Sequence, residues 1–388
     1  MLTKNIKFTN FYNNKKIKNL NPKIKEFKKE NFLQSVPLLQ SFSNNYKYSY
    51  SKKLINKLKK KKVFRVVGMG GSVLGTKAIY SFLKKKIKKK FIFIDNLNPQ
   101  LTSRQNATNI IISKSGQTLE TIANLNILTK FNKSKDFYFI TENKTSHLSN
   151  LAKEMKSEIF EHKNFIGGRY SVLSEVGMLP AELMGLNEKK FKKYNNLIKN
   201  KNFVHMLILN VEHTLNFIKK KRMNSIILNY DFCSENFFKW YQQLISESLG
   251  KKSRGVIPII SQMPMDNHSL LQLYLDGPKK NFFTFYSVRN DKSDIINQHK
   301  FKNKIKYLEN KKLSKIIDTQ KKATQNVFFK KEIPYRSFEI TSRSESSLGE
   351  LFCFFVFETI LLGRALRVNP FDQPSVELIK KETKKLLS

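Results

Sequence analysis

The chain has 388 residues, is 40% hydrophobic and 12% aromatic, and carries a formal net charge of +42. This composition excludes an intrinsically disordered chain and provides enough apolar surface for a large core divided between two lobes. Because the lysines form short blocks along the whole chain and arginine is sparse, we interpret most of the charge as solvated surface rather than a specific nucleic-acid site.

The cysteines and apolar runs favour a cytoplasmic protein without a membrane partner. Only Cys233 and Cys353 occur, so we expect a reducing compartment, no disulfide and no cysteine-rich metal site. The N-terminus is polar and lacks the apolar stretch of a secretory signal. The longest apolar run, 351–363, contains Glu358 and is too short to span a bilayer.

The first half of the chain alternates buried strands with amphipathic helices. Residues 1–50 are predicted to form a partly ordered basic leader, followed by a first lobe over 51–185. Short runs of β-branched and aromatic residues predict strands in this lobe at 63–69, 91–95, 109–113 and 137–141. Helix-length stretches between them indicate a doubly wound parallel sheet.

The pattern recurs in a second lobe, predicted over 186–343. Its strands are expected at 225–230, 256–261 and 282–288, and its helices at 235–250 and 268–277. A helical region over 172–221 separates the two sets of strands, and helices over 344–388 close the molecule. The predicted fold class is therefore α/β, with two doubly wound lobes joined and closed by helices.

The first strand-to-helix corner is rich in glycine. The stretch "VVGMGGSVLGTK" (66–77) offers G-x-G, but the third glycine of a dinucleotide motif falls on Val73, although Asp95 ends the next strand as a ribose-binding acid would. A Walker A loop also fails, because Gly75 is followed by Thr-Lys. We interpret the corner as a tight turn that lets a ligand approach the backbone, with a ligand-free turn as the alternative.

The second corner, "IIISKSGQTLETI" (110–122), combines hydroxyls with one lysine. Ser113, Lys114, Ser115 and Thr118 surround the point where a strand passes into a helix. Backbone N–H groups and the helix dipole favour an anion there, which predicts a phosphate cradle. A simple N-cap cluster is the alternative. Both corners would lie at the carboxyl edge of one sheet, where doubly wound folds bind ligands.

Six ordered motifs resemble the glucose-6-phosphate isomerase family, in its bacterial branch built from two sugar-isomerase domains. They are "GMGGSVLGTKA", "ISKSGQTLET", "GGRYSVLSEVGMLPAEL", "QQLISESLGK", "DNHSLLQLYLDGP" and "NPFDQPSVELIKK", and the likeness spans 63–381. The resemblance implies a cytoplasmic homodimer of glycolysis and gluconeogenesis that interconverts glucose 6-phosphate and fructose 6-phosphate. It implies no cofactor and no metal, and the chain lacks zinc-site motifs.

The resemblance also assigns roles to individual residues. The phosphate would bind Ser113, Lys114, Ser115 and Thr118, and the sugar would bind Gly71, Ser72, Gln243 and Gln373. Glu247 would be the base that moves a proton between C2 and C1, and Arg169 would stabilise the enediolate. Ring opening would use His268, supplied by the neighbouring subunit, and Lys380. Without the motifs these would be ordinary surface or capping residues, and Lys381 leaves the lysine register open by one residue.

Two departures and three alternatives accompany this assignment. Ser375 replaces a glycine of the family, and Glu175 places a carboxylate that we expect to weaken the charge of Arg169. A dual isomerase that also accepts mannose 6-phosphate stays open, as does a non-catalytic sugar-phosphate-binding module. A basic nucleic-acid or membrane-surface protein is disfavoured, because clustered arginines and aromatic platforms are missing from the sequence.

Overall fold

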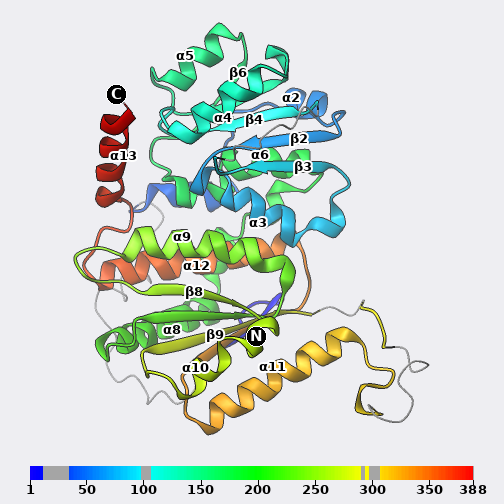
Figure 1. Ribbon diagram of the computed structural model, residues 1–388, viewed down its shortest axis with the longest axis vertical. Helices are drawn as coiled ribbons and strands as arrows, with labels where there is room; N and C mark the ends of the chain where they lie inside the picture. Colours follow the sequence, from blue (N-terminus) through cyan, green and yellow to red (C-terminus); the bar gives the residue numbers. More distant parts are fainter. Residues whose placement is uncertain (12–34, 98–105, 290–292, 297–305, 388) are drawn as a thin grey trace.

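The computed structural model describes residues 1–11, 35–97, 106–289, 293–296 and 306–387. It contains two five-stranded sheets, one in each lobe. Between them lies a layer of helices that includes α3 (Leu74–Phe82), α9 (Glu235–Leu249) and α12 (Glu345–Ala365), as Figure 1 shows. The predicted α/β fold with two doubly wound lobes is confirmed.

The first sheet is parallel and has the order β3-β2-β4-β5-β6. Its strands are β2 (Val63–Val67), β3 (Lys90–Ile94), β4 (Thr108–Ile112), β5 (Phe137–Thr141) and β6 (Glu158–Glu161). The chain leaves β2 through α3 toward β3, and leaves β4 through α4 (Leu119–Thr129) toward β5, on the opposite side. Because these connections diverge, a crevice forms between the carboxyl ends of β2 and β4.

The second sheet has the order β1-β10-β9-β7-β8. Its strands are β1 (Ile6–Thr9), β7 (Asn224–Asn229), β8 (Ile257–Gln262), β9 (Asn281–Val288) and β10 (Tyr335–Ile340), and only β1 is antiparallel to its neighbour. Strand β1 falls inside the predicted leader. Its buried Ile6 and Phe8 lie opposite Ile340 and Phe338, so two apolar side chains cover the sheet edge.

The remaining helices pack around this frame. They are α2 (Lys52–Leu58), α5 (His147–Glu154), α6 (Glu175–Leu183), α7 (Tyr194–Lys199), α8 (Lys201–Lys219), α10 (Leu271–Asp276), α11 (Leu313–Lys330) and α13 (Pro374–Leu387). Helix α12 is the one described helix that is long and apolar enough to cross a membrane. Of its most apolar 18-residue stretch, 94% is buried inside the protein. Its Glu358 is paired there with Arg336 and accepts a hydrogen bond from Asn210, both through Oε1, so the buried charge is balanced, whereas Oε2 has no hydrogen-bond partner among the described residues.

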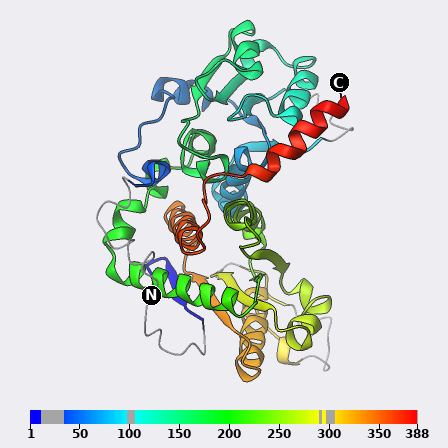
Figure 2. The same cartoon turned by 90° about the vertical axis from the view of Figure 1, so that its left-hand side faces the viewer.

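Helix α13 differs from the others because none of its described residues is buried. It follows the segment that leaves α12 and lies along the outside of the first lobe in both views (Figures 1 and 2). Val376, Leu378 and Ile379 are among its exposed apolar side chains. The C-terminal helix is therefore attached mainly through the segment that precedes it, where Pro370, Asp372 and Gln373 accept hydrogen bonds from Arg169.

Candidate functional site

The glycine-rich corner packs directly against a second glycine pair. A Cβ on Gly71 would lie 2.2 Å from the carbonyl carbon of Gly168, so no larger residue allows these two backbones to approach. Arg169 follows Gly168, and the corner therefore fixes the start of the segment that carries this arginine. Asp95, the candidate ribose-binding acid, instead accepts from Lys77 Nζ at 2.6 Å. The tight-turn interpretation describes this corner better than a dinucleotide site.

The guanidinium of Arg169 is held on nearly every side, and its side chain is only 1% exposed. Its Nε donates to Ser248 Oγ at 2.8 Å, and its Nη2 donates to the carbonyl oxygens of Pro370 at 2.6 Å and Asp372 at 3.0 Å. Trp240 Nε1 donates to the backbone oxygen of Arg169 at 3.1 Å. This is a positive charge fixed in position, with its fork of donors already oriented.

Glu247 lies beside this guanidinium but keeps access to solvent. It sits near the end of α9, and its side chain is 29% exposed. One carboxylate oxygen accepts from Arg169 Nη1 at 3.2 Å, and the other accepts from Gln243 Nε2 at 2.9 Å. Gln373 Oε1 also accepts from Arg169 Nη1, at 2.6 Å. The structure thus brings together four of the residues named from the sequence, from three separate parts of the chain.

The arrangement of Arg169, Glu247, Gln243 and Gln373 has a definite chemical capacity. A partly exposed carboxylate can take a proton from a substrate carbon and return it to a neighbouring carbon. The guanidinium beside it stabilises the anion that forms between these two steps. Two side-chain amides can hydrogen-bond hydroxyl groups at the same place.

The hydroxyl-rich corner lies next to the glycine turn, since a Cβ on Gly68 would be 2.8 Å from the carbonyl oxygen of Ile112 at the end of β4. Ser113 Oγ is 2.9 Å from Thr118 Oγ1 and accepts from Gly116 N at 3.2 Å. Gly116 has a φ of +66°, which a residue with a Cβ adopts only with strain. The hydroxyls thus shape the turn at the start of α4. These bonds are compatible with the cradle interpretation. They do not support a simple N-cap cluster, because the N-cap residue Thr118 makes no side-chain capping hydrogen bond to α4.

Lys114 points from this corner toward the neighbouring strand ends. Its Nζ donates to the carbonyl oxygen of Asn164 at 2.8 Å and lies 3.5 Å from Glu142 Oε1. Burial would raise the pKa of Glu142, but the hydrogen bond from Lys144 and the charge of Lys114 outweigh it and lower that pKa. Lys114 is therefore paired on one side with a carboxylate that stays ionised.

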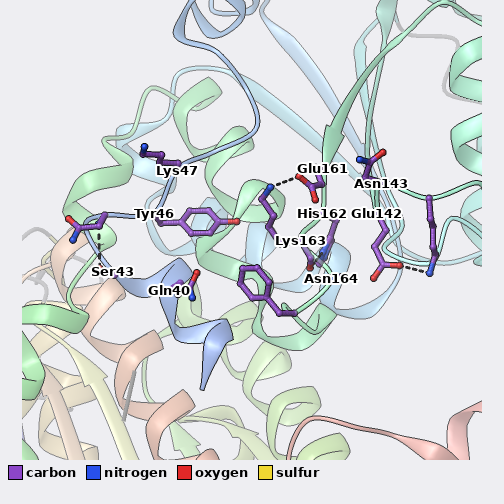
Figure 3. Close-up of a pocket in the computed structure, with 13 residues that line it drawn as sticks. Gln40, Ser43, Tyr46, Lys47, Glu142, Asn143, Glu161, His162, Lys163 and Asn164 are labelled. Carbon is purple, nitrogen blue, oxygen red and sulfur yellow. Dashed lines mark hydrogen bonds and ion pairs between the residues drawn. The ribbon is translucent and has the colours of Figure 1, made fainter. Parts of the chain in front are cut away.

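A cavity of about 950 Å³ lies on that side of Lys114 (Figure 3). Glu142 and Asn164 line it together with His162, and the segment with Tyr46 and Lys47 forms the opposite wall. Arg169 and Glu247 are not among its lining residues. The cavity thus borders the hydroxyl-rich corner, whereas the carboxylate–guanidinium pair lies elsewhere, beside the glycine turn.

Comparison with known proteins decides the family. A sequence model of phosphoglucose isomerase matches residues 52–256, just over half of the chain. A glucose-6-phosphate isomerase of Methanocaldococcus jannaschii is 32% identical over 334 residues, which cover 81% of this chain and 82% of that protein. The chain belongs to the phosphoglucose isomerase family.

Solved structures agree with this family's fold. A hypothetical protein of Thermus thermophilus superimposes with a TM-score of 0.83 at 22% identity, over 95% of both chains. A glucose-6-phosphate isomerase of Chlamydia trachomatis gives a TM-score of 0.70 at 19% identity, over 86% of this chain and 71% of that one. The fold of two sugar-isomerase lobes is therefore shared with solved structures.

Two residues that the family resemblance assigns to ring opening lie apart from the Arg169–Glu247 pair. His268 is exposed in a short 3-10 turn, Met265–His268, that follows β8. Lys380 lies on α13, with its side chain 59% exposed, and donates to Glu377 at 2.6 Å. Within the described part of the chain, neither residue forms a hydrogen bond or ion pair with Arg169 or Glu247. Ser375 lies in the first turn of the same helix.

The expectation that Glu175 weakens Arg169 is wrong. Its buried carboxylate accepts from Tyr46 OH at 2.8 Å and from Ser49 N at 2.9 Å. The guanidinium of Arg169 donates to other side chains and not to Glu175. Glu175 therefore anchors the segment before α2 instead of opposing the guanidinium. This departure from the family pattern has a structural role in the first lobe.

Several residues that position the pair were not singled out from the sequence. Tyr170 OH is 2.8 Å from Ser248 Oγ and donates to the carbonyl oxygen of Pro370 at 2.9 Å. Burial raises the pKa of Tyr170, so its phenol stays protonated and can donate. The sequence offered one indication of these residues, because Tyr170 directly follows Arg169 and Ser248 directly follows Glu247. Adjacency alone, however, does not tell which neighbour turns inward.

Proposed function

We propose that this protein is a glucose-6-phosphate isomerase that reversibly converts glucose 6-phosphate and fructose 6-phosphate through ring opening and a cis-enediolate. The observation that carries the proposal is the buried Arg169 guanidinium with Glu247 on its open side, 3.2 Å away. An aldose–ketose conversion needs a base and a fixed positive charge beside the same two carbons. The names of relatives such as the M. jannaschii enzyme support the substrate.

In the central step, Glu247 removes the proton from C2 of the open sugar and returns it to C1. Negative charge develops on the enediolate oxygens, and Arg169 donates to them. Because its guanidinium is already fixed by Ser248 and Gln373, little reorganisation accompanies this step. Gln243 keeps the Glu247 carboxylate oriented between the two transfers.

The substrate phosphate would be bound by the hydroxyl-rich corner, with Ser113, Ser115 and Thr118 as donors and Lys114 as the cation. The corner adjoins the glycine turn through Gly68, so a ligand anchored there extends past Gly71 and Ser72 toward Arg169. Such anchoring supplies binding energy at a distance from the reacting carbons and orients them.

Ring opening is assigned to His268 and Lys380, with His268 supplied by a second subunit of a homodimer. An exposed imidazole can shuttle a proton to the ring oxygen. Helix α13 begins directly after Gln373, which is bonded to Arg169, so Lys380 lies on an element attached at the site. We place the enzyme in the cytoplasm, acting in glycolysis and gluconeogenesis.

A coupled assay tests this function directly. Purified protein receives fructose 6-phosphate, and a dehydrogenase specific for glucose 6-phosphate reports the product through NADP reduction, at low and moderate salt. Turnover at both salt concentrations supports the proposal, and mannose 6-phosphate is then the next substrate. Binding of fructose 6-phosphate without turnover would overturn the isomerase and favour a sugar-phosphate-binding module.

A further inference from the structure

The two sheets repeat one topology, so the second lobe has a crevice of its own. The order β3-β2-β4-β5 in the first sheet corresponds to β8-β7-β9-β10 in the second. In both, the first of these strands along the chain is an inner strand, the second lies on one side of it at the sheet edge, and the third and fourth lie on the other side. The carboxyl ends of β7 and β9 therefore correspond to those of β2 and β4, where the first lobe carries the glycine-rich corner and the hydroxyl-rich corner.

A cavity of about 890 Å³ lies at this point of the second lobe. Residues after β7, the end of β9 and the start of α11 line it, and Lys85 reaches it from the first lobe. None of the residues assigned to the isomerase reaction takes part in its wall. The second lobe thus has an open space where its topology places a binding site, and that space has no role in the proposed reaction.

The charged groups of this cavity are mostly paired inside its wall. Arg343 donates to both carboxylate oxygens of Asp231, at 2.5 and 3.1 Å. Lys321, only 5% exposed, donates to Ser287 Oγ at 2.8 Å and lies 3.0 Å from Asp318 and 3.7 Å from Glu339. These bonds fix a set of carboxylate and hydroxyl oxygens that can accept further hydrogen bonds from a ligand.

Two exposed lysines add positive charge at the same cavity. Lys85 and Lys315 both line it, and no carboxylate lies within ion-pair distance of either among the described residues. Asp294 also lines the cavity and contributes a negative charge there. A phosphate group binds lysine as a compact charge and accepts its hydrogen bonds, so the two ammonium groups favour a phosphate ester over a neutral sugar.

We propose that the cavity between the ends of β7 and β9 is a second ligand site, which binds a small phosphorylated polyol. Its phosphate would contact Lys85 and Lys315, and its hydroxyls would donate to Asp231 and Asp318. Since Lys85 belongs to the first lobe, the bound ligand would bridge the two lobes. The proposal does not depend on the isomerase activity, because it shares no residue with that site.

Cys233 provides a reporter inside this cavity. It lines the wall and is partly exposed, whereas Cys353, the other cysteine, is fully buried. Burial raises the pKa of the Cys233 thiol, and the positive charges of Arg343 and Lys85 act in the opposite direction. A bound phosphate would cover the thiol and offset these charges, and both effects reduce the thiolate that alkylating reagents need.

The experiment measures alkylation of Cys233 by iodoacetamide in the full chain, with peptide mass spectrometry. The probe is sorbitol 6-phosphate, which has no carbonyl to isomerise. Sorbitol, inorganic phosphate and sodium chloride at equal ionic strength are the comparisons. At a probe concentration ten times its Kd, mass action predicts an alkylation rate lowered by about tenfold. Inorganic phosphate should protect more weakly, and sorbitol or salt should not protect.

Paired variants separate this site from the isomerase site. Lys315→Glu should abolish protection and leave isomerase turnover unchanged, while Lys330→Glu, the same change in the last turn of α11, should keep protection. Lys114→Ala should keep protection as well, because it alters only the first lobe. Equal protection by sodium chloride, or protection that survives Lys315→Glu, would overturn the second site even if the isomerase assay succeeds.

Discussion

The centre and the periphery of the candidate site differ in how firmly the protein holds them. The Arg169 side chain is 1% exposed and donates to Ser248, Gln373 and the carbonyl oxygens nearby. The Lys380 side chain is 59% exposed, and among the described residues its one ion pair is with its helix neighbour Glu377. A preorganised charge stabilises a transition state without further ordering. A mobile lysine must lose side-chain entropy when it acts. Under the proposed mechanism, chemistry that depends on fixed charge is thus built into the fold, and proton delivery would be left to exposed groups.

The strongest test of this contrast is the substitution Glu247→Gln at the centre. The amide retains a hydrogen-bond acceptor for Arg169 but cannot take a proton, so kcat should fall by about 10²–10⁴-fold while KM changes little. The coupled assay measures turnover, and the thermal midpoint should stay near that of the unchanged protein. A variant with kcat within tenfold of the original would show that another group is the base.

A smaller effect is expected at the periphery, from Lys380→Ala. Loss of a proton-delivering group should lower kcat by about 10²-fold, at the lower end of the range for acid–base catalysis, because water can replace an exposed ammonium in part. Stability should not change, since the side chain is exposed and its pairing with Glu377 is a surface ion pair. Lys381→Ala is the matched control.

The outcome also resolves the register of this helix. If Lys381→Ala lowers kcat and Lys380→Ala does not, the sequence assignment is displaced by one residue. If neither variant changes turnover, α13 carries no catalytic lysine, and ring opening must use groups nearer the Arg169–Glu247 pair.

The sequence predicted the regular parts of the fold well, because buried parallel strands leave continuous apolar runs. All the strands proposed from such runs are present, including 109–113 as β4 and 137–141 as β5. Strands β1, β6 and β10 and helices α2, α5 and α11 were missed. In β10, Arg336 and Glu339 interrupt the apolar residues, and Arg336 is buried with Glu358 on α12, Asn210 on α8 and Thr284 on β9 as its partners. A partner so distant in sequence leaves no local pattern.

The site shows the same limit. The motif positions identified Arg169 and Glu247, but the contacts that fix them come from backbone oxygens such as that of Pro370, which carry no residue signature. Glu175 shows the converse, since its sequence position beside the arginine motif suggested interference, and tertiary packing directs it to Tyr46 and Ser49 instead. Side-chain direction is decided by packing rather than by spacing.

At the hydroxyl-rich corner we expect Lys114→Ala to change binding rather than chemistry. Losing one charge-assisted hydrogen bond to the phosphate costs about 1.5–3 kcal/mol, which raises KM by roughly ten- to a hundredfold at nearly constant kcat. Lys144→Ala is the matched control, because Lys144 pairs with the same Glu142 but lies outside the loop. A change confined to kcat, or an equal rise in KM for both variants, would remove Lys114 from phosphate binding.

The smallest effect on activity is expected from His162→Gln, which tests the wall of the cavity beside Lys114. Burial lowers the pKa of His162 from 6.5 to about 4. Its Nε2 has no hydrogen-bond partner among the residues that the structure describes, and its ring Nδ1 lies 3.3 Å from the carbonyl oxygen of Lys163. Between pH 6.5 and 4 the unfolded chain binds a proton that the folded chain does not, so acid lowers the free energy of unfolding by about 3 kcal/mol.

Glutamine does not titrate, so the variant should lose less stability between pH 7 and pH 4.5 than the unchanged protein does, with equal turnover at pH 7.5. Urea unfolding at both pH values measures this difference, and His205→Gln, at an exposed position of α8, should leave the acid sensitivity intact. An unchanged pH slope in His162→Gln would mean that the imidazole becomes protonated inside the folded protein. The wall beside Lys114 would then admit solvent and belong with the exposed periphery of the site rather than with its fixed centre.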